Sequence, residues 1–263
     1  MERIIRIKYT KEGMMKYLSH LNLVQIFSRA IRRAELPVSI SNGFNPRFRI
    51  SFCPPLPLGI NSQAEYLDIK VIESVNLKEL QKRLNHALPE GIKVIKGKEI
   101  PSLSSSLSKT IDSALFIVFL DLKRKKNNQQ AAININSNQI LTLASEEQKD
   151  KAIRKNLIER EDNYRLIEIN QEIRNFLQQK EMIIEKSKPE GVKRIDIRPF
   201  ISIMQGLNYK KGVLELKLHL KIGPQGNINP CSLVEYWLNQ SPYQGEIIQI
   251  YRQELYRQGR AVM

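Results

Sequence analysis

The chain has 263 residues, of which 41% are hydrophobic and 26% are charged, and its formal net charge is +15. This content is enough to bury a core in each of two domains, and the strong positive charge predicts an anionic partner. No apolar run reaches the roughly 18 residues of a membrane span, no secretory leader is evident, and the 2 cysteines lie far apart. We therefore expect a cytoplasmic protein with no membrane partner.

The first hundred residues alternate between strand-like and helix-like periods. Helical spacing of apolar residues predicts helices over 19–34 and 77–88. The predicted strands lie at residues 5–9, 38–40, 49–51, 67–71 and 92–95. The order β-α-β-β-α-β predicts a ferredoxin-like unit over residues 1–100.

A second unit of the same kind is predicted over residues 111–263, after a serine-rich linker at 101–110. Its predicted elements are strands at 116–122, 182–185, 214–222 and 246–253, and helices at 170–179 and 230–238. An insertion at about 123–169 interrupts it, with a helical pattern over 146–161. The sequence therefore predicts an α+β fold of two tandem ferredoxin-like (βαββαβ) units.

Positive charge is concentrated at the start of the chain. Residues 1–60 hold ten Lys/Arg against three Asp/Glu, a net charge of +7. On the first predicted helix, Ser19 is the expected N-cap with Asn22 at the N3 position, which gives both a structural role. Further along the helix several arginines share one face, and arginine binds phosphate bidentately. A solvated helix surface is the alternative interpretation.

The loop after this helix combines turn residues with cations and aromatics. Gly43 permits a positive φ and Pro46 stiffens the turn, so both are expected to shape a rigid loop. Aromatic rings beside arginines are typical of surfaces that stack bases and clamp phosphates. In the alternative interpretation, Phe44 fills the core. The residues expected to bind RNA in this unit are Arg29, Arg32, Arg33, Phe44, Arg47, Phe48 and Arg49.

A second basic segment follows in the other unit. In residues 193–199, alternation places Arg194, Asp196 and Arg198 on one strand face, where Asp196 is expected to bridge the two arginines. Together with Lys193, they form either a second wall of a basic groove for RNA or a surface ion-pair ladder. The sequence leaves these two interpretations equal.

Signals for catalysis are weak. The chain has no Gly-rich phosphate loop, no HExxH motif and no cysteine cluster, so we predict neither a metal site nor a cofactor. His20 and Glu65 are the weak catalytic candidates, although nothing marks them as an acid–base pair. Glu65 and Asp68 are also placed to orient the arginines of the basic loop.

An ordered set of motifs resembles the radical SAM-linked protein family, an uncharacterised bacterial group found beside or fused to radical SAM proteins. The set is YLSHLNL at 17–23, RAIRRAELP at 29–37, GFNP at 43–46, PLPLGI at 55–60 and EYLD at 65–68, with looser likeness in DIRP at 196–199 and RQELY at 252–256. The chain departs from the family pattern at Asn22, where Asp is usual, and at Arg47 and Phe48, where His-Pro is usual. The resemblance implies a companion radical SAM protein that carries the iron–sulfur cluster.

Our leading hypothesis is an RNA-binding accessory protein without catalysis of its own, working with a radical SAM enzyme in the modification of tRNA or rRNA. The alternative is a protein-interaction adaptor that docks on the radical SAM enzyme without binding RNA. A third hypothesis is an RNA-modifying or RNA-cleaving enzyme that uses His20 with Glu65.

Overall fold

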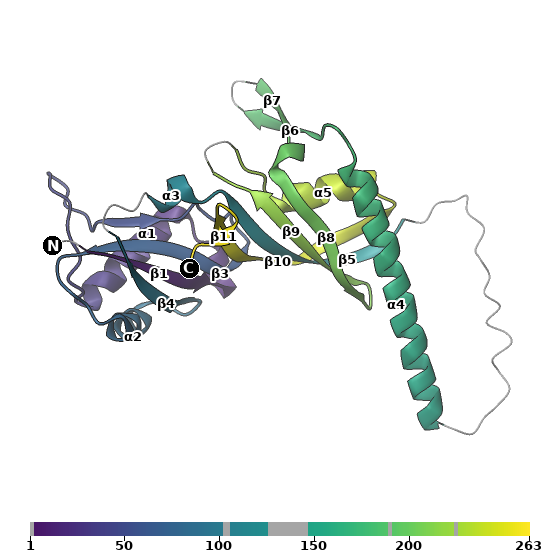
Figure 1. Ribbon diagram of the computed structural model, residues 1–263, viewed down its shortest axis with the longest axis horizontal. Helices are drawn as coiled ribbons and strands as arrows, with labels where there is room; N and C mark the ends of the chain where they lie inside the picture. Colours follow the sequence, from purple (N-terminus) through teal and green to yellow (C-terminus); the bar gives the residue numbers. More distant parts are fainter. Residues whose placement is uncertain (1–2, 102–105, 126–146, 189–190, 224–225) are drawn as a thin grey trace.

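The computed structural model of the chain describes residues 3–101, 106–125, 147–188, 191–223 and 226–263 (Figure 1). The elements of the first half are β1 (Arg3–Lys11), the 3-10 helix η1 (Gly13–Tyr17), α1 (His20–Arg33), β2 (Ile50–Phe52), β3 (Asn61–Val71), α2 (Leu77–Ala87) and β4 (Ile92–Ile100). Those that follow are α3 (Leu107–Thr110), β5 (Ser113–Arg124), α4 (Glu147–Leu177), β6 (Ile183–Lys188), β7 (Gly191–Asp196), the 3-10 helix η3 (Arg198–Phe200), β8 (Ile201–Lys210), β9 (Val213–Lys221), α5 (Pro230–Gln240), β10 (Tyr243–Arg257) and β11 (Arg260–Ala261).

One large, mostly antiparallel sheet runs through the molecule. Its strand order is β4-β1-β3-β10-β5-β9-β8, with β2 beside β3 and β11 beside β10. The two halves meet where β3 and β10 pair in parallel, through Asn61 with Tyr251 and Ser62 with Arg252. The chain is therefore a mixed α/β protein whose halves share one sheet.

The first half follows the predicted order of elements. Strand β1 buries Ile5, Ile7 and Tyr9 on one face of the sheet. They pack in one core with the buried residues of α1 and α2. The predicted strand at 38–40 is reduced to two isolated bridges, Val38 with Val71 and Ile40 with Phe48.

The second half buries alternate residues of its strands against α4 and α5. Leu216 and Leu218 of β9 are buried with Trp237 of α5 and Ile173 of α4 in one core. The residues between them, such as Lys217, lie on the opposite face of the sheet. We call this opposite face the open face, because α4 and α5, the helices that pack on this half of the sheet, lie against the other side.

Three expectations for the second half are corrected. The segment at 182–185 is not a strand of the main sheet, because β6 pairs only with β7 in a separate two-stranded sheet. The main-sheet strand is β8, over residues 201–210, which the sequence pattern did not predict. The helical segments at 146–161 and 170–179 belong to the single long helix α4, while residues 126–146 of the insertion lie outside the described residues.

Candidate nucleic-acid interface

Helix α1 carries three exposed arginines near its carboxyl end. The helix starts after Ser19, whose Oγ accepts a hydrogen bond from the Asn22 N–H at 3.2 Å. This is the N-cap arrangement expected from the sequence. Arg29, Arg32 and Arg33 are exposed. Arg32 and Arg33 lie in the last turn, where the helix dipole favours cations.

Two of these arginines contact other parts of the chain. The Arg32 guanidinium lies 6.0 Å from the centre of the Phe48 ring, and Phe48 itself is half-buried against the core of the first half. Arg33 donates from Nη2 to the Ala87 carbonyl at 2.6 Å, at the end of α2. Arg29 and Arg32 are therefore better placed than Arg33 to contact phosphate, and Phe48 is a support for Arg32 rather than an open stacking surface.

Residues 41–47 form a loop closed by its own hydrogen bonds. The Ser41 N–H donates to the Arg47 carbonyl at 2.8 Å, and the Arg47 N–H donates to Ser41 Oγ at 3.0 Å. Gly43 has a φ of 132°, which favours glycine. Phe44 is fully exposed, so the interpretation in which it fills the core is wrong.

The other predicted residues of this loop differ in exposure. Pro46 and Arg47 are exposed, whereas Arg49 is half-buried at the base of the loop. The backbone of Arg49 is held between Ser39, which accepts its N–H at 2.8 Å, and Lys70, which donates to its carbonyl at 3.1 Å. The loop therefore exposes Phe44 in its middle and Arg47 at the position where it closes on Ser41.

The second basic segment does not form the predicted ladder. Arg198 lies on η3 and not on β7, so it does not share a strand face with Arg194. Arg194 instead pairs with Glu185 across the hairpin, at 3.2 Å between exposed side chains. Lys193 is exposed on the same strand.

Asp196 and Arg198 have structural contacts of their own. Asp196 Oδ1 accepts the backbone N–H groups of Met182 at 2.9 Å and Arg198 at 3.0 Å, so it does not bridge two arginine side chains. Arg198 donates to the carbonyls of Leu177 at 3.0 Å and Ile201 at 3.3 Å. These bonds connect the end of α4 to the start of β8.

The two basic segments lie far apart. In Figure 1 the hairpin β6–β7 projects from the second half, while α1 lies within the first half. They do not face each other as two walls of one groove.

A buried ion pair joins the halves of the sheet. Arg252 of β10 donates from Nε to Glu65 Oε1 of β3 at 2.8 Å, and its Nη2 also donates to the carboxylate. Arg252 and Glu65 are 1% and 2% exposed. Burial is the largest single influence and disfavours the charged guanidinium. The charge and hydrogen bonds of Glu65, together with Cys53 and Tyr9, oppose it, and their combined effect raises the pKa of Arg252.

Further polar contacts cross the same junction. Glu254 of β10 accepts the Tyr66 hydroxyl and is paired with Lys8, both at 2.6 Å. Within the first half, Arg6 forms a two-pronged pair with Asp68 at 2.8 and 2.9 Å. Glu65 and Asp68 therefore do not orient the arginines of the basic loop, as the sequence led us to expect.

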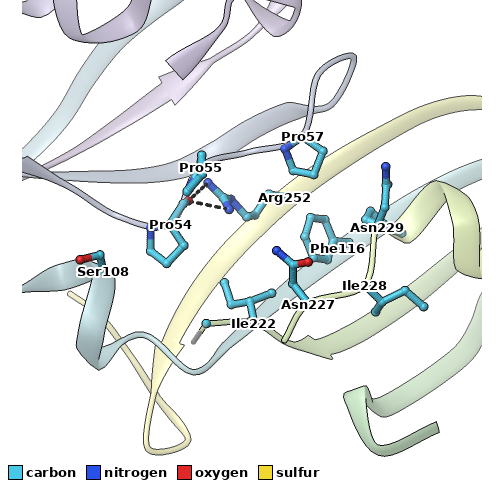
Figure 2. A pocket seen from close by; sticks show the side chains of 12 residues that line it. Pro54, Pro55, Pro57, Ser108, Phe116, Ile222, Asn227, Ile228, Asn229 and Arg252 are labelled. Atoms are coloured by element: carbon cyan, nitrogen blue, oxygen red, sulfur yellow. Dashed lines mark hydrogen bonds between the residues drawn. The ribbon is translucent and has the colours of Figure 1, made fainter. Parts of the chain in front are cut away.

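A cavity of about 370 Å³ lies beside Arg252. Figure 2 shows the Arg252 side chain directed at Pro54, whose carbonyl accepts two of its hydrogen bonds at 3.3 Å. Phe116 supplies apolar wall, and Asn227 and Asn229 are the neutral polar groups of the loop before α5. Arg252 is already bonded to Glu65 and Pro54, and the two asparagines are neutral amides. None of these side chains therefore forms an acid–base pair.

The two weak catalytic candidates, His20 and Glu65, both line a second, smaller cavity. His20 and Glu65 surround it with Tyr9, Lys11 and Cys53. Burial, followed by the Glu65 carboxylate, raises the pKa of the Cys53 thiol, and burial likewise raises that of Tyr9. Both groups therefore stay protonated and are poor nucleophiles, while Glu65 is occupied by Arg252.

Sequence reasoning missed the importance of Arg252. Its residue type and its place in RQELY were visible, but its partner Glu65 is 187 positions away in the sequence. The available signal was the position of Arg252 within a predicted strand. A charge buried there needs an oppositely charged partner.

The described part of the chain offers neither a cluster of metal ligands nor a membrane-spanning helix. No group of three or more His, Cys, Asp or Glu side chains is placed there to hold a metal ion. Of the helices the structure describes, none is both long and apolar enough to span a membrane.

Comparison with known proteins places the chain in a family. No curated protein matches it. The family described as "Uncharacterized protein conserved in bacteria (DUF2344)" matches residues 4–230. That description names neither RNA nor a radical SAM protein, so both partners stay predictions. Because the match extends over both halves of the sheet, the chain belongs to this family of conserved bacterial proteins.

Proposed function

We propose that the protein binds RNA through the first half of the sheet, at a surface made by Arg29, Arg32, Phe44 and Arg47. We call it the arginine–loop surface. The observation that carries the proposal is the fully exposed Phe44 ring on a loop that its own hydrogen bonds hold in shape.

An aromatic ring in water gains nothing from exposure, whereas a base can stack on it with about 1–3 kcal/mol of binding energy. Arginines beside such a ring bind the neighbouring phosphates. The combination of Phe44 with Arg47 on one loop supports RNA more directly than a basic helix alone, because charge by itself is also compatible with a solvated surface.

The protein serves, in this proposal, as an accessory to a radical SAM enzyme that modifies tRNA or rRNA. The ordered motifs in residues 17–68 support this partnership through their resemblance to the radical SAM-linked family. The present chain then supplies RNA affinity, and the companion enzyme supplies the cluster and the reaction.

The test is binding of tRNA and rRNA fragments across a range of salt concentrations. Variant R29A/R32A should weaken binding and reduce the slope of log K against log salt by about 1.4–1.8, since each of the two phosphate contacts contributes roughly 0.7–0.9. Variant K193A/R194A removes the same charge from the distant hairpin and should change neither quantity. Equal losses in both variants would contradict the assignment of the surface.

We also propose that each half of the sheet is a ferredoxin-like unit. Two observations support it: the strand orders β4-β1-β3-β2 and β10-β5-β9-β8. Each order places the first strand of its half between the last strand and the third, with antiparallel neighbours.

A protein-interaction adaptor is the second candidate function. Exposed apolar side chains gather around η1 and the start of α1, namely Met14, Tyr17, Leu21 and Leu58. The loop carrying Leu58 is joined to η1 by a hydrogen bond from the Gly59 N–H to the Lys16 carbonyl at 3.0 Å. Exposed apolar residues on neighbouring segments favour a protein contact.

This second candidate predicts that a purified radical SAM partner binds the chain without RNA. Variant L21S/L58S should abolish that binding, while R29A/R32A should not. Retention of the complex in L21S/L58S would remove the adaptor hypothesis.

We do not propose catalysis by His20 with Glu65. The Glu65 carboxylate is committed to Arg252, and His20 packs its ring against Phe52 at 5.4 Å. Unaltered RNA after prolonged incubation with the protein alone is the expected result.

A further inference from the structure

The open face of the second half carries aromatic rings in a shallow hollow. Phe119 of β5 and Tyr251 of β10 meet edge to face, with ring centres 6.3 Å apart. They line a hollow of about 510 Å³ together with Ile117 and Gln249. Both rings are half-buried, so part of each is accessible to solvent.

A second ring contact lies further along the same face. His219 of β9 and Tyr256 of β10 have ring centres 5.0 Å apart. His219 pairs with Leu115, four positions before Phe119 on β5, which corresponds to about 13 Å along the strand. The two aromatic contacts thus lie one after the other along the same face of the sheet.

The groups around these rings suit nucleotides. Gln63, Gln249 and Gln253 line the hollow, and amide side chains can both donate to and accept from base edges. One cation, Lys217, stands between the ring contacts on β9, and one carboxylate, Glu215, lines the hollow. Exposed cations also stand at the strand ends, at Lys210 and Lys221.

The same face continues onto the basic strands of the first half. Glu254 links the two parts by accepting Tyr66 and pairing with Lys8. Lys8 is the register partner of Lys96, and Arg6 that of Lys98, so their side chains project from the same side of the sheet. Lys96 and Lys98 are exposed.

We propose that this open face binds unpaired nucleotides of the RNA, whose bases stack on Phe119 and Tyr251. We call it the aromatic platform. The inference rests on the proposed RNA-binding function and deepens it. Single-stranded segments present the faces of their bases, while a duplex hides them. Helix α1, which carries part of the arginine–loop surface, covers the other side of the sheet. One RNA that contacts both surfaces therefore needs an unpaired segment for the platform and a neighbouring folded part for the arginines.

The test compares a short labelled oligoadenylate with its duplex on oligouridylate, by fluorescence anisotropy with the full chain. Variant F119L/Y251L keeps apolar volume at both positions but removes the rings. It should bind the single strand about tenfold or more weakly, because stacking contributes roughly 1–3 kcal/mol per base, and it should bind the duplex as the wild type does. Variant Y164L replaces an exposed tyrosine on α4 and should match the wild type on both RNAs.

The outcomes separate this inference from the proposed function. Unchanged single-strand affinity in F119L/Y251L, with the wild type binding RNA, overturns the platform and leaves the arginine–loop surface standing. No binding of either RNA by the wild type overturns the proposed function and the platform together. Self-association of the wild type that is lost in F119L/Y251L, without RNA binding, would identify the face as a contact between copies of the chain.

Discussion

The two halves of the sheet use their cations differently. In the first half, Arg29, Arg32 and Arg47 are exposed beside an exposed Phe44. In the second half, Arg198 is bonded to backbone carbonyls and Arg194 pairs with Glu185, while the open face carries an aromatic hollow. A basic segment in a sequence can therefore serve either a partner or the chain's own packing. The contacts of each cation, rather than its charge, distinguish the two uses.

The ion pair between the halves should give the largest effect. In R252M, Glu65 is left as a buried charge without its partner, which costs about 3–5 kcal/mol in comparable pairs. We expect a corresponding loss in the free energy of unfolding, measured by urea denaturation. Variant R3M removes an exposed pair with Glu99 at 3.4 Å and should change stability little. A loss in R252M no larger than that in R3M would show that the junction does not depend on the pair.

Phe44 provides the next largest effect, and it should act on binding alone. F44A should weaken RNA binding by about 1–3 kcal/mol, the usual contribution of one base stacked on an aromatic ring. The unfolding midpoint should not move, because the side chain is fully exposed. F44W should preserve affinity, since tryptophan also stacks. If F44A binds RNA normally, the ring is not a stacking surface, and the arginine–loop surface loses the observation on which it rests.

These comparisons depend on features that the sequence revealed unevenly. The order of elements in the first half followed from residue periodicity, because β1 and α1 bury residues at steps typical of strand and helix. Strand β8 did not, because its pairing with β9 shifts register twice, between Ile201 and Ile203 and between Gly206 and Asn208. Such irregularities break the alternation that marks a strand.

The site was revealed unevenly for a related reason. The composition of the basic loop indicated a surface, since charged residues seldom pack inward. The sequence could not show which arginine has an internal partner: Arg252 pairs with a residue 187 positions away, and Arg198 bonds to carbonyls that any residue type could supply. The aromatic platform also depends on strand pairing, because Phe119 and Tyr251 become neighbours only through the β5–β10 register.

Arg198 tests the assignment of the second basic segment to internal packing. R198A removes bonds to the carbonyls of Leu177 and Ile201, and each such bond contributes about 1 kcal/mol, or somewhat more from a charged donor. We expect a lower urea midpoint and unchanged RNA affinity. K193A, on the neighbouring strand, should change neither. A loss of RNA affinity in R198A at full stability would return this segment to the RNA-binding surface.

The smallest effect concerns His219 and the pH dependence of stability. Burial, followed by the Lys217 charge, lowers the pKa of His219 below its usual 6.5, and Asp112 only partly opposes this. The unfolded chain therefore takes up a proton first as the pH falls below about 6.5, so stability contributed by the neutral imidazole declines from that pH downward. In H219Q this component should disappear, so the free energy of unfolding should depend less on pH between about 7.5 and 5.5 than in the wild type. A control variant, H86Q, replaces an exposed histidine on α2 and should retain the wild-type slope. An unchanged slope in H219Q would mean that the imidazole stays accessible to protons on the open face, and that the His219–Tyr256 contact is looser than the 5.0 Å between its rings indicates.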